Sequence, residues 1–165
     1  MEIIDIVDIN DNVIRQATRK EAHSNPSLMH RIVHFTLINS KNKKTLLTQR
    51  SFKKSHDAGK YCFLGEHVMS KESYKEAVIR GIKEELGVIV KNTIEQAINI
   101  FKYDSQTELT GFYVASIGNE KLHFCEDEIE KVVWISIDKL MDSSLDISEM
   151  TKFWIEKVDW YKVFI

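Results

Sequence analysis

Apolar and polar residues follow two different periods along the chain, and these periods predict a mixture of strands and helices. Runs rich in β-branched and aromatic residues predict strands. The predicted strands cover residues 3–8, 13–18, 31–39, 45–50, 95–103, 107–116 and 131–137. The first two flank the polar turn at 10–12 and form a predicted hairpin, and the next two form a second one. The pattern indicates mixed α and β content.

Residues 72–86 change to a helical period and contain no proline. Their apolar residues share one arc of about 100° on a helical wheel, as in a helix that lies on a core. These residues are Val78, Ile79, Ile82 and Leu86. Gly87 provides a helix stop, and Ser70 or Ser73 provides a cap. Further helical segments are predicted at 19–24, 138–141 and 147–158.

Composition narrows the class of protein. The 165 residues are 43% hydrophobic with one proline and six glycines, which predicts a single domain spanning 1–165. The 23 basic and 25 acidic residues leave a net charge of -2, so we expect a small-molecule ligand and no nucleic-acid or membrane partner. The start lacks a secretion signal, and two cysteines, expected to be buried, suit a cytoplasmic location.

Glu84 and Glu85 are the first candidate for chemistry. They lie beside the apolar arc and straddle the direction of Gly81. Paired carboxylates are oxygen ligands for Mg²⁺, which commonly contacts substrate phosphates at the same time. Such an ion neutralises phosphate charge and activates water. Glutamate pairs are also common on solvated helix faces, so the spacing around the pair decides between the two interpretations.

That spacing, over residues 65–88, resembles the signature of the Nudix hydrolase superfamily. The positions that match in register are Glu72, Arg80, Ile82, Glu84, Glu85, Gly87 and Val88. Two positions depart from it. Glu66 stands where the signature has glycine, and Gly81 stands where it has the first glutamate after the arginine.

The resemblance implies a fold, a reaction and a metal. The fold would be an α/β/α sandwich with a mixed β-sheet, carrying residues 1–24 as an N-terminal hairpin extension. The reaction would be hydrolysis of a nucleoside diphosphate linked to another moiety, with Mg²⁺ or Mn²⁺. By the same resemblance the metal ligands would be Glu84, Glu85, the carbonyl of Gly65, and Glu108 from a downstream strand.

Three further roles follow in that interpretation. Arg80 would orient the acidic helix through Glu72 or Glu84. A loop acid, Glu126 or Glu128, would take the proton of the attacking water. The basic segment with Arg50 and Lys53 would face a polyanionic substrate, although such segments are often solvated loops.

The N-terminal half resembles the branch of the superfamily that contains isopentenyl-diphosphate isomerase. Histidines at the places of His23, His30 and His67 are metal ligands in that enzyme, and imidazole suits Mn²⁺ or Zn²⁺. The isomerase has its catalytic cysteine where this chain has Gly65, and one of its acids where this chain has Gln106. The three histidines are therefore an alternative metal site, and isomerase activity ranks low.

Three hypotheses stay open. The first is the metal-dependent hydrolase, which needs a substitute for the glutamate missing at position 81. The second is a Nudix domain that binds a nucleotide or diphosphate and turns it over slowly or not at all. The third is the isomerase-like protein. The leaving group cannot be read from the sequence, and an N-terminal hairpin can pair with a second copy to form a homodimer.

Overall fold

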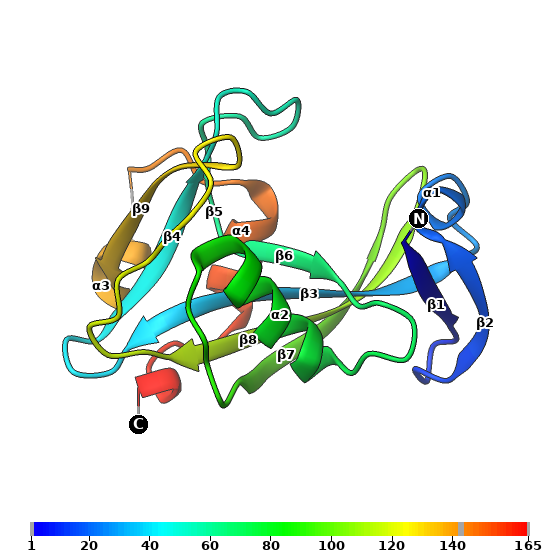
Figure 1. Ribbon diagram of the computed structural model, residues 1–165, viewed down its shortest axis with the longest axis horizontal. Helices are drawn as coiled ribbons and strands as arrows, with labels where there is room; N and C mark the ends of the chain where they lie inside the picture. The colour runs from blue at the N-terminus through cyan, green and yellow to red at the C-terminus, as the bar shows by residue number, and fades with distance from the viewer. Residues whose placement is uncertain (1, 142–143, 165) are drawn as a thin grey trace.

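The computed structural model of the chain describes residues 2–141 and 144–164. Nine strands form one sheet (Figure 1). They are β1 (Ile3–Val7), β2 (Val13–Thr18), β3 (Met29–Asn39), β4 (Lys44–Arg50), β5 (Tyr61–Cys62), β6 (Leu64–His67), β7 (Ile94–Lys102), β8 (Thr107–Ser116) and β9 (Ile129–Ser136). The helices are α1 (Arg19–Ala22), α2 (Tyr74–Leu86), α3 (Ile137–Met141), α4 (Glu149–Lys157) and the short 3₁₀ helix η1 (Lys162–Phe164).

Strand β3 is the centre of the sheet. It pairs in parallel with β8 over ten residues and antiparallel with β6 on its other edge. Its pairing with β4 covers only Ile38 with Thr45 and Asn39 with Lys44. Because β3 and β4 pair only beside their turn, β6 can pair with β3 while β5 and β9 pair with β4. The sheet is mixed, with β3 and β8 as its parallel pair.

Helices cover the two faces of this sheet. Successive strand residues point to opposite faces, so Val33, Phe35 and Leu37 of β3 share one face. They pack in one apolar cluster with the inner side of α2, which lies in front of the sheet in Figure 1. A second cluster, with Phe112 of β8 and Trp154 of α4, covers the opposite face. The architecture is an α/β/α sandwich with a mixed sheet, as the family resemblance implied.

Local sequence explains where α2 begins and ends. Ser73 caps it, and the side chain of Glu76 reaches back to the Ser73 amide to complete a capping box. Gly87 ends it in the left-handed conformation at φ 68°, with its amide donating to the carbonyl of Lys83. Of the two serines that the sequence offered as caps, the structure uses Ser73.

The structure adds two strands to the predicted elements. The segment expected to start as a loop at Gly65 begins within β6, and β5 precedes it. Both are too short to show a period, and they are strands because of their pairing with β3 and β4. The expected burial of both thiols was wrong, because Cys62 is half-buried and Cys125 is exposed. Within the described ranges, none of the helices has the length and apolar character needed to span a membrane.

Candidate functional site

Four carboxylates gather near the C-terminal half of α2. Glu84 and Glu85 come from the helix, Glu66 comes from β6, and Glu128 precedes β9. Burial raises the pKa of the half-buried Glu85, and the negative charges of Glu66, Glu128 and Glu84 raise it further. Clustered carboxylates of this kind are a donor group for a hard divalent cation. We call these four residues the acidic face.

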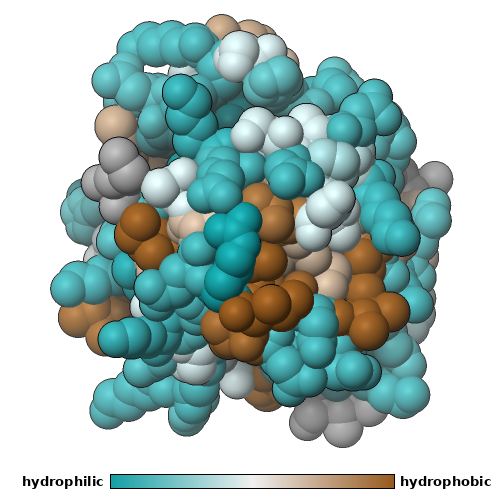
Figure 2. Space-filling view, turned by 90° about the vertical axis from the view of Figure 1, so that its right-hand side faces the viewer, coloured by the Kyte–Doolittle hydropathy of each residue, from teal (hydrophilic) through white to brown (hydrophobic). Residues whose placement is uncertain are grey.

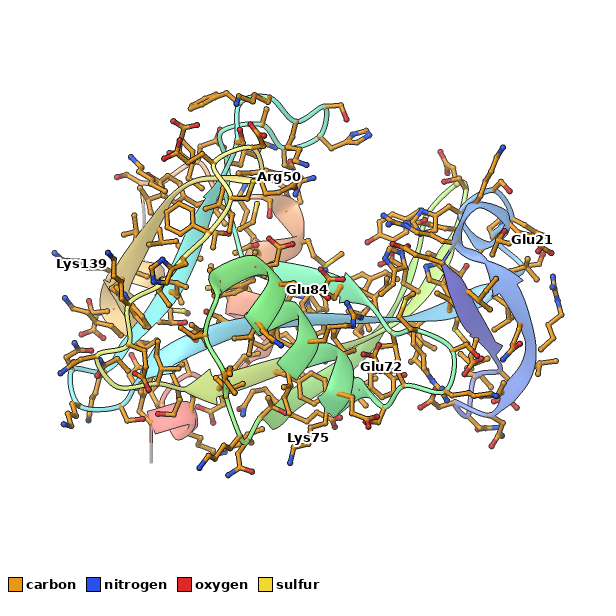
Figure 3. The ribbon with its side chains drawn as sticks, viewed as in Figure 1. Glu21, Arg50, Glu72, Lys75, Glu84 and Lys139 are labelled. Carbon is orange, nitrogen blue, oxygen red and sulfur yellow. The ribbon has the colours of Figure 1, made fainter. Side chains whose placement is uncertain are left out.

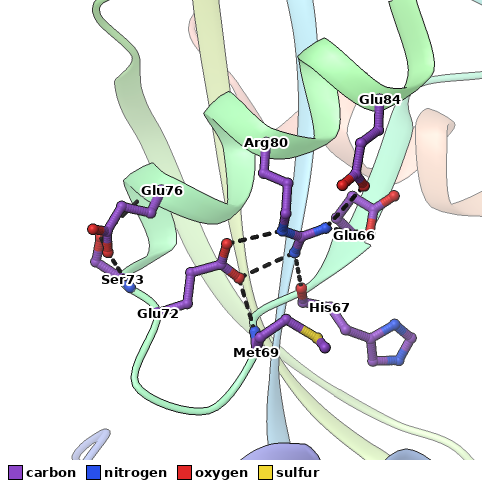
Figure 4. A network of polar contacts seen from close by, with 8 residues as sticks. All are labelled: Glu66, His67, Met69, Glu72, Ser73, Glu76, Arg80 and Glu84. Carbon is purple, nitrogen blue, oxygen red and sulfur yellow. Dashed lines mark hydrogen bonds and ion pairs between the residues drawn. The ribbon is translucent and has the colours of Figure 1, made fainter. Parts of the chain in front are cut away.

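Arg80 links two members of the acidic face, Glu66 and Glu84 (Figure 4). Its guanidinium donates to both carboxylate oxygens of Glu72, from Nε at 2.9 Å and from Nη2 at 3.0 Å. Nη1 donates to Glu84 at 3.2 Å and to Glu66 at 3.3 Å, and Nη2 donates to the carbonyl of His67 at 2.8 Å. These charge-assisted bonds raise the pKa of Arg80 and tie β6 to α2. Arg80 thus contacts both Glu72 and Glu84, the two partners expected from the sequence.

Basic residues of the segment after β4 face the acidic loop before β9. Lys54 forms an ion pair with Glu128, and Lys53 forms one with Asp127. The side chain of Lys53 is 70% exposed, so it lies on the rim. Arg50, at the end of β4 (Figure 3), donates from Nε to the carbonyl of His56 at 2.8 Å. A small cavity of about 70 Å³ is lined by Arg50, Gly65, Glu85 and Glu128 together with apolar neighbours.

A larger cavity, of about 260 Å³, adjoins β3 and β6. Its polar lining includes Arg50, His34, Glu66, His67 and Glu108, and Trp154 and Met150 of α4 are among its apolar lining. Arg50 and Gly65 line both cavities. The two hollows therefore share a wall next to the acidic face.

Glu108 lies apart from the acids of α2. The register pairs it with His30 of β3, and strand alternation then turns both side chains to the face opposite α2. It is buried and accepts a hydrogen bond from Gln106 at 2.7 Å. Burial raises its pKa to about 7, against the opposing effect of a hydrogen bond from Tyr103. This position differs from the predicted ligand set, because it places Glu108 near the histidines and away from Glu84 and Glu85.

His23, His30 and His67 come together from α1, β3 and β6. One ring nitrogen of each lies within 4.8 Å of the others, and the Nε2 atoms of His23 and His67 are 2.7 Å apart. Burial lowers the pKa of all three, to about 4 for His30 and about 3 for His67, so the rings are neutral at pH 7. Among the residues that the structure describes, the buried Nε2 of His30 finds no hydrogen-bond partner. Neutral imidazoles with a free lone pair are a donor set for a transition metal. We call these three the histidine group.

His34 occupies the space beside Gly65. A Cβ atom built on Gly65 would lie 2.5 Å from Cδ2 of His34, which is too close for a side chain there. Trp154 donates from Nε1 to Nδ1 of His34 at 2.7 Å. Because indole nitrogen is a donor only, Nδ1 must be the acceptor and the neutral ring carries its proton on Nε2. Sequence reasoning gave no role to either residue, although His34 shares the strand alternation of His30.

The structure places an acidic helix against a mixed sheet. The NUDIX domain family matches residues 28–154, and the chain belongs to this family. A Nudix hydrolase of unassigned function from Nostoc is 34% identical over 88 residues, which is 53% of this chain and 52% of the relative. Isopentenyl-diphosphate Delta-isomerase 1 of Photorhabdus laumondii is 30% identical over 116 residues, covering 68% and 63%. The chain thus spans about half to two thirds of the length of these relatives.

Solved structures show the same fold at low sequence identity. A protein of Deinococcus radiodurans superposes with a TM-score of 0.71 at 21% identity, covering 94% of this chain and 99% of the other. The NUDIX domain of NrtR from Shewanella oneidensis, crystallised in complex with ADP ribose, gives a TM-score of 0.63 at 16% identity, covering 86% and 90%. These similarities support the sandwich architecture.

Proposed function

We propose that this protein is a metal-dependent hydrolase of a small-molecule diphosphate, such as a nucleoside diphosphate linked to another moiety. The observation that carries the proposal is the convergence of Glu66, Glu84, Glu85 and Glu128 at one end of α2, of which Glu84 and Glu85 match the Nudix signature. An ion held there would neutralise the diphosphate charge and activate a water. Glu84, Glu85 and the carbonyl of Gly65 are the proposed ligands, and Mg²⁺ or Mn²⁺ suits their hard oxygens.

Glu128 is the proposed acceptor of the water's proton. It lines the small cavity together with Glu85, and its ion pair with Lys54 fixes its position. In this scheme Arg80 does not contact the ion or the diphosphate. It is a positioning residue, because its ion pairs hold Glu84 and Glu66 in place. Glu126 is the weaker candidate for this role, because Glu128 and not Glu126 lines the cavity.

Arg50 and Lys53 are proposed to bind the anionic substrate. Arg50 lines both cavities, so a diphosphate at the acidic face lies within its reach. Lys53 would exchange its exposed pairing with Asp127 for a substrate phosphate, at small cost because exposed ion pairs contribute little. The ADP ribose in the NrtR complex is a diphosphate flanked by two larger groups, which agrees with this class of substrate.

The histidine group supports a second candidate, an isomerase-like function. Its favouring observations are the close approach of three neutral histidines and the similarity to the Photorhabdus isomerase. Against it, Gly65 offers no thiol, and His34 fills the space that a cysteine at position 65 would need. Binding without turnover is a further candidate, favoured by the two departures from the signature at Gly81 and Glu66.

The test is phosphate release from a panel of nucleoside diphosphate derivatives with Mg²⁺ or Mn²⁺. Wild-type protein is expected to hydrolyse at least one of them, and Glu85→Gln is expected to lose that activity. Binding of a panel member without hydrolysis would support the non-catalytic candidate. Conversion of isopentenyl diphosphate to its allylic isomer would support the isomerase and contradict the hydrolase proposal.

Three broader properties are proposed with this function. The chain forms one domain, in which the N-terminal extension contributes His23 to the histidine group. The extension also exposes apolar residues at the hairpin end of the molecule (Figure 2), among them Val13 and Ile14 of the outer strand β2. An exposed strand with apolar side chains suits pairing with a second copy, so a homodimer is proposed. A cytoplasmic location is proposed from the sequence alone.

A further inference from the structure

The two departures from the Nudix signature are neighbours in space. A Cβ atom built on Gly81 of α2 would lie 2.6 Å from Cγ of Glu66, and 2.8 Å and 2.9 Å from the ring of Phe35. Contacts this short do not occur between real side chains. Glu66 therefore occupies the volume into which a side chain at position 81 would project.

We propose that Glu66 supplies from strand β6 the carboxylate that the Nudix signature places on the helix at position 81. This inference rests on the proposed function, since it assigns Glu66 as a ligand of the divalent ion at the acidic face. The signature has glycine on the strand and glutamate on the helix. This chain has glutamate on the strand and glycine on the helix, so the acid has changed sides without leaving the site.

Strand register aims Glu66 at α2. Its partner in register is Val33, which packs under α2, and strand neighbours in register share a face. Its neighbours along β6, Gly65 and His67, consequently face the other side. A four-residue strand therefore presents a single acid to the helix, and that acid is Glu66.

The contacts of Glu66 place its carboxylate among the other acids. Nη1 of Arg80 donates to Glu66 at 3.3 Å and to Glu84 at 3.2 Å, so one nitrogen joins the two carboxylates (Figure 4). The side chain of Glu66 is 21% exposed, which leaves it open to an entering ion. The bond to Arg80 is long for a charge-assisted pair, so the carboxylate keeps acceptor capacity for that ion.

The presence of Glu66 on the strand requires glycine at position 81 of the helix. Phe35 is fully buried and closes the other side of the same space, so a side chain at 81 would have to displace both Glu66 and Phe35. Glycine within a helix costs about 0.5 to 1 kcal/mol relative to alanine. Glycine is present at position 81 despite this cost, because Glu66 and Phe35 already fill the space that a side chain there would need.

The first test measures Mn²⁺ affinity by electron paramagnetic resonance in wild type and Glu66→Gln. The glutamine keeps the shape of the side chain, so thermal unfolding is expected to change little, while Mn²⁺ affinity and hydrolysis each fall at least tenfold. Glu149→Gln is the matched control, because it removes one carboxylate paired with a lysine on the opposite side of the sheet. Unchanged Mn²⁺ affinity and unchanged hydrolysis in Glu66→Gln would overturn the inference.

The second test exchanges the two residues. Glu66→Gly and Gly81→Glu are each expected to lose activity, the first by removing the acid and the second by collision with Glu66. Glu66→Gly combined with Gly81→Glu and Phe35→Leu restores the family's arrangement and is expected to recover activity above either single variant. Gly81→Glu alone reaching or exceeding the wild-type rate would contradict the inference. If the combined variant does not fold, Glu66→Gln decides.

The outcomes separate this inference from the proposed function. If wild type hydrolyses no diphosphate but Glu66→Gln still weakens Mn²⁺ binding, the function is wrong and the assignment of Glu66 stands. If wild type hydrolyses a diphosphate and Glu66→Gln matches it in rate and Mn²⁺ affinity, the function stands and the assignment is wrong.

Discussion

The acidic face and the histidine group occupy opposite faces of the short strand β6 and the part of β3 that pairs with it. Glu66 of β6 points toward α2, and the next residue, His67, points away from it into the histidine group. Strand alternation turns the two side chains to opposite faces, while Glu66 and His67 both line the cavity of about 260 Å³. One strand can therefore contribute to two different donor sets when adjacent residues within it, here Glu66 and His67, differ in chemistry.

The two regions also differ in charge and exposure. The acidic face carries negative charge, balanced in part by Arg80 and Lys54, and the side chain of Glu84 is 56% exposed. The histidine group is neutral at pH 7, and His30 is fully buried. Oxygen ligands of the first kind favour Mg²⁺ or Mn²⁺, whereas imidazoles favour a transition metal such as Zn²⁺. We therefore expect the two regions to bind different ions.

The largest expected effects come from exchanging one donor in each region. Glu85→Gln is expected to lower Mg²⁺-dependent hydrolysis by about 100-fold or more, since even groups that only support a ligand contribute about 10- to 100-fold. It should leave the visible absorption of bound Co²⁺ intact. His67→Asn should abolish that Co²⁺ absorption. Loss of the Co²⁺ signal in Glu85→Gln would show that the two regions form one site.

A smaller effect is expected at the guanidinium of Arg80. Arg80→Lys keeps the positive charge but loses the paired hydrogen bonds to Glu72 and the bonds to Glu84 and Glu66. Hydrolysis should fall about tenfold, the scale of a supporting group. Co²⁺ binding should not change. Measuring kcat and KM separately distinguishes a positioning role, which lowers kcat, from loss of substrate binding, which raises KM.

The pH dependence of stability should separate Glu108 from the histidines. An unfolded histidine has a pKa of about 6.5, whereas burial lowers the pKa of folded His30 to about 4 and that of folded His67 to about 3. As pH falls below 6.5, the unfolded chain binds protons that the folded protein does not bind, so stability is lost from pH 6.5 towards pH 4. The pKa of folded Glu108 is about 7, whereas its ordinary value is 4.5. The folded residue stays protonated where the unfolded residue ionises, so its contribution to stability is lost as pH rises from 4.5 to 7. The two trends oppose each other between pH 4.5 and 6.5.

Replacing Glu108 or His67 should therefore reveal the pH dependence of stability that the other group causes. With a chelator present, Glu108→Gln should make stability rise more steeply between pH 5 and 6.5 than in wild type, and His67→Gln should flatten it. Urea unfolding at several pH values measures both slopes. Parallel slopes in all three proteins would contradict the burial assigned to these groups.

The smallest effect on hydrolysis is expected at Trp154. Trp154→Phe removes the donor to Nδ1 of His34 and leaves a buried acceptor unpaired, at a cost of about 1 to 3 kcal/mol in stability. Nitrogen chemical shifts of His34 should show the proton on Nε2 in wild type and a mixture of tautomers in the variant. A wild-type ring protonated on Nδ1 would rule out this hydrogen bond.

The sequence predicts those parts of the molecule that depend on local pattern. The long strands β3 and β8 and helix α2 have clear periods, and the fixed spacing of Glu72, Arg80, Glu84 and Glu85 identifies the family. The resemblance to the isomerase branch also selects the three histidines that the structure brings together. These features need no knowledge of how strands pair.

The rest depends on register. Strand β6 contains Gly65, Glu66 and His67 and shows no period, so the sequence gives no sign that Glu66 and His67 face opposite sides. The family resemblance groups Glu108 with the acids of α2, whereas its pairing with His30 turns its side chain to the opposite face of the sheet. A shift of one residue in register reverses every side chain of a strand, so these assignments require the folded structure.

The most direct test of the central claim is a crystal structure with Mn²⁺ and a non-hydrolysable diphosphate analogue, using anomalous scattering to locate the ion. We expect a Mn²⁺ peak bound by Glu66 and Glu85 on the α2 side of β6, in contact with the diphosphate. A diphosphate bound only through an ion on the histidine group, with Glu66 still paired to Arg80 alone, would contradict it.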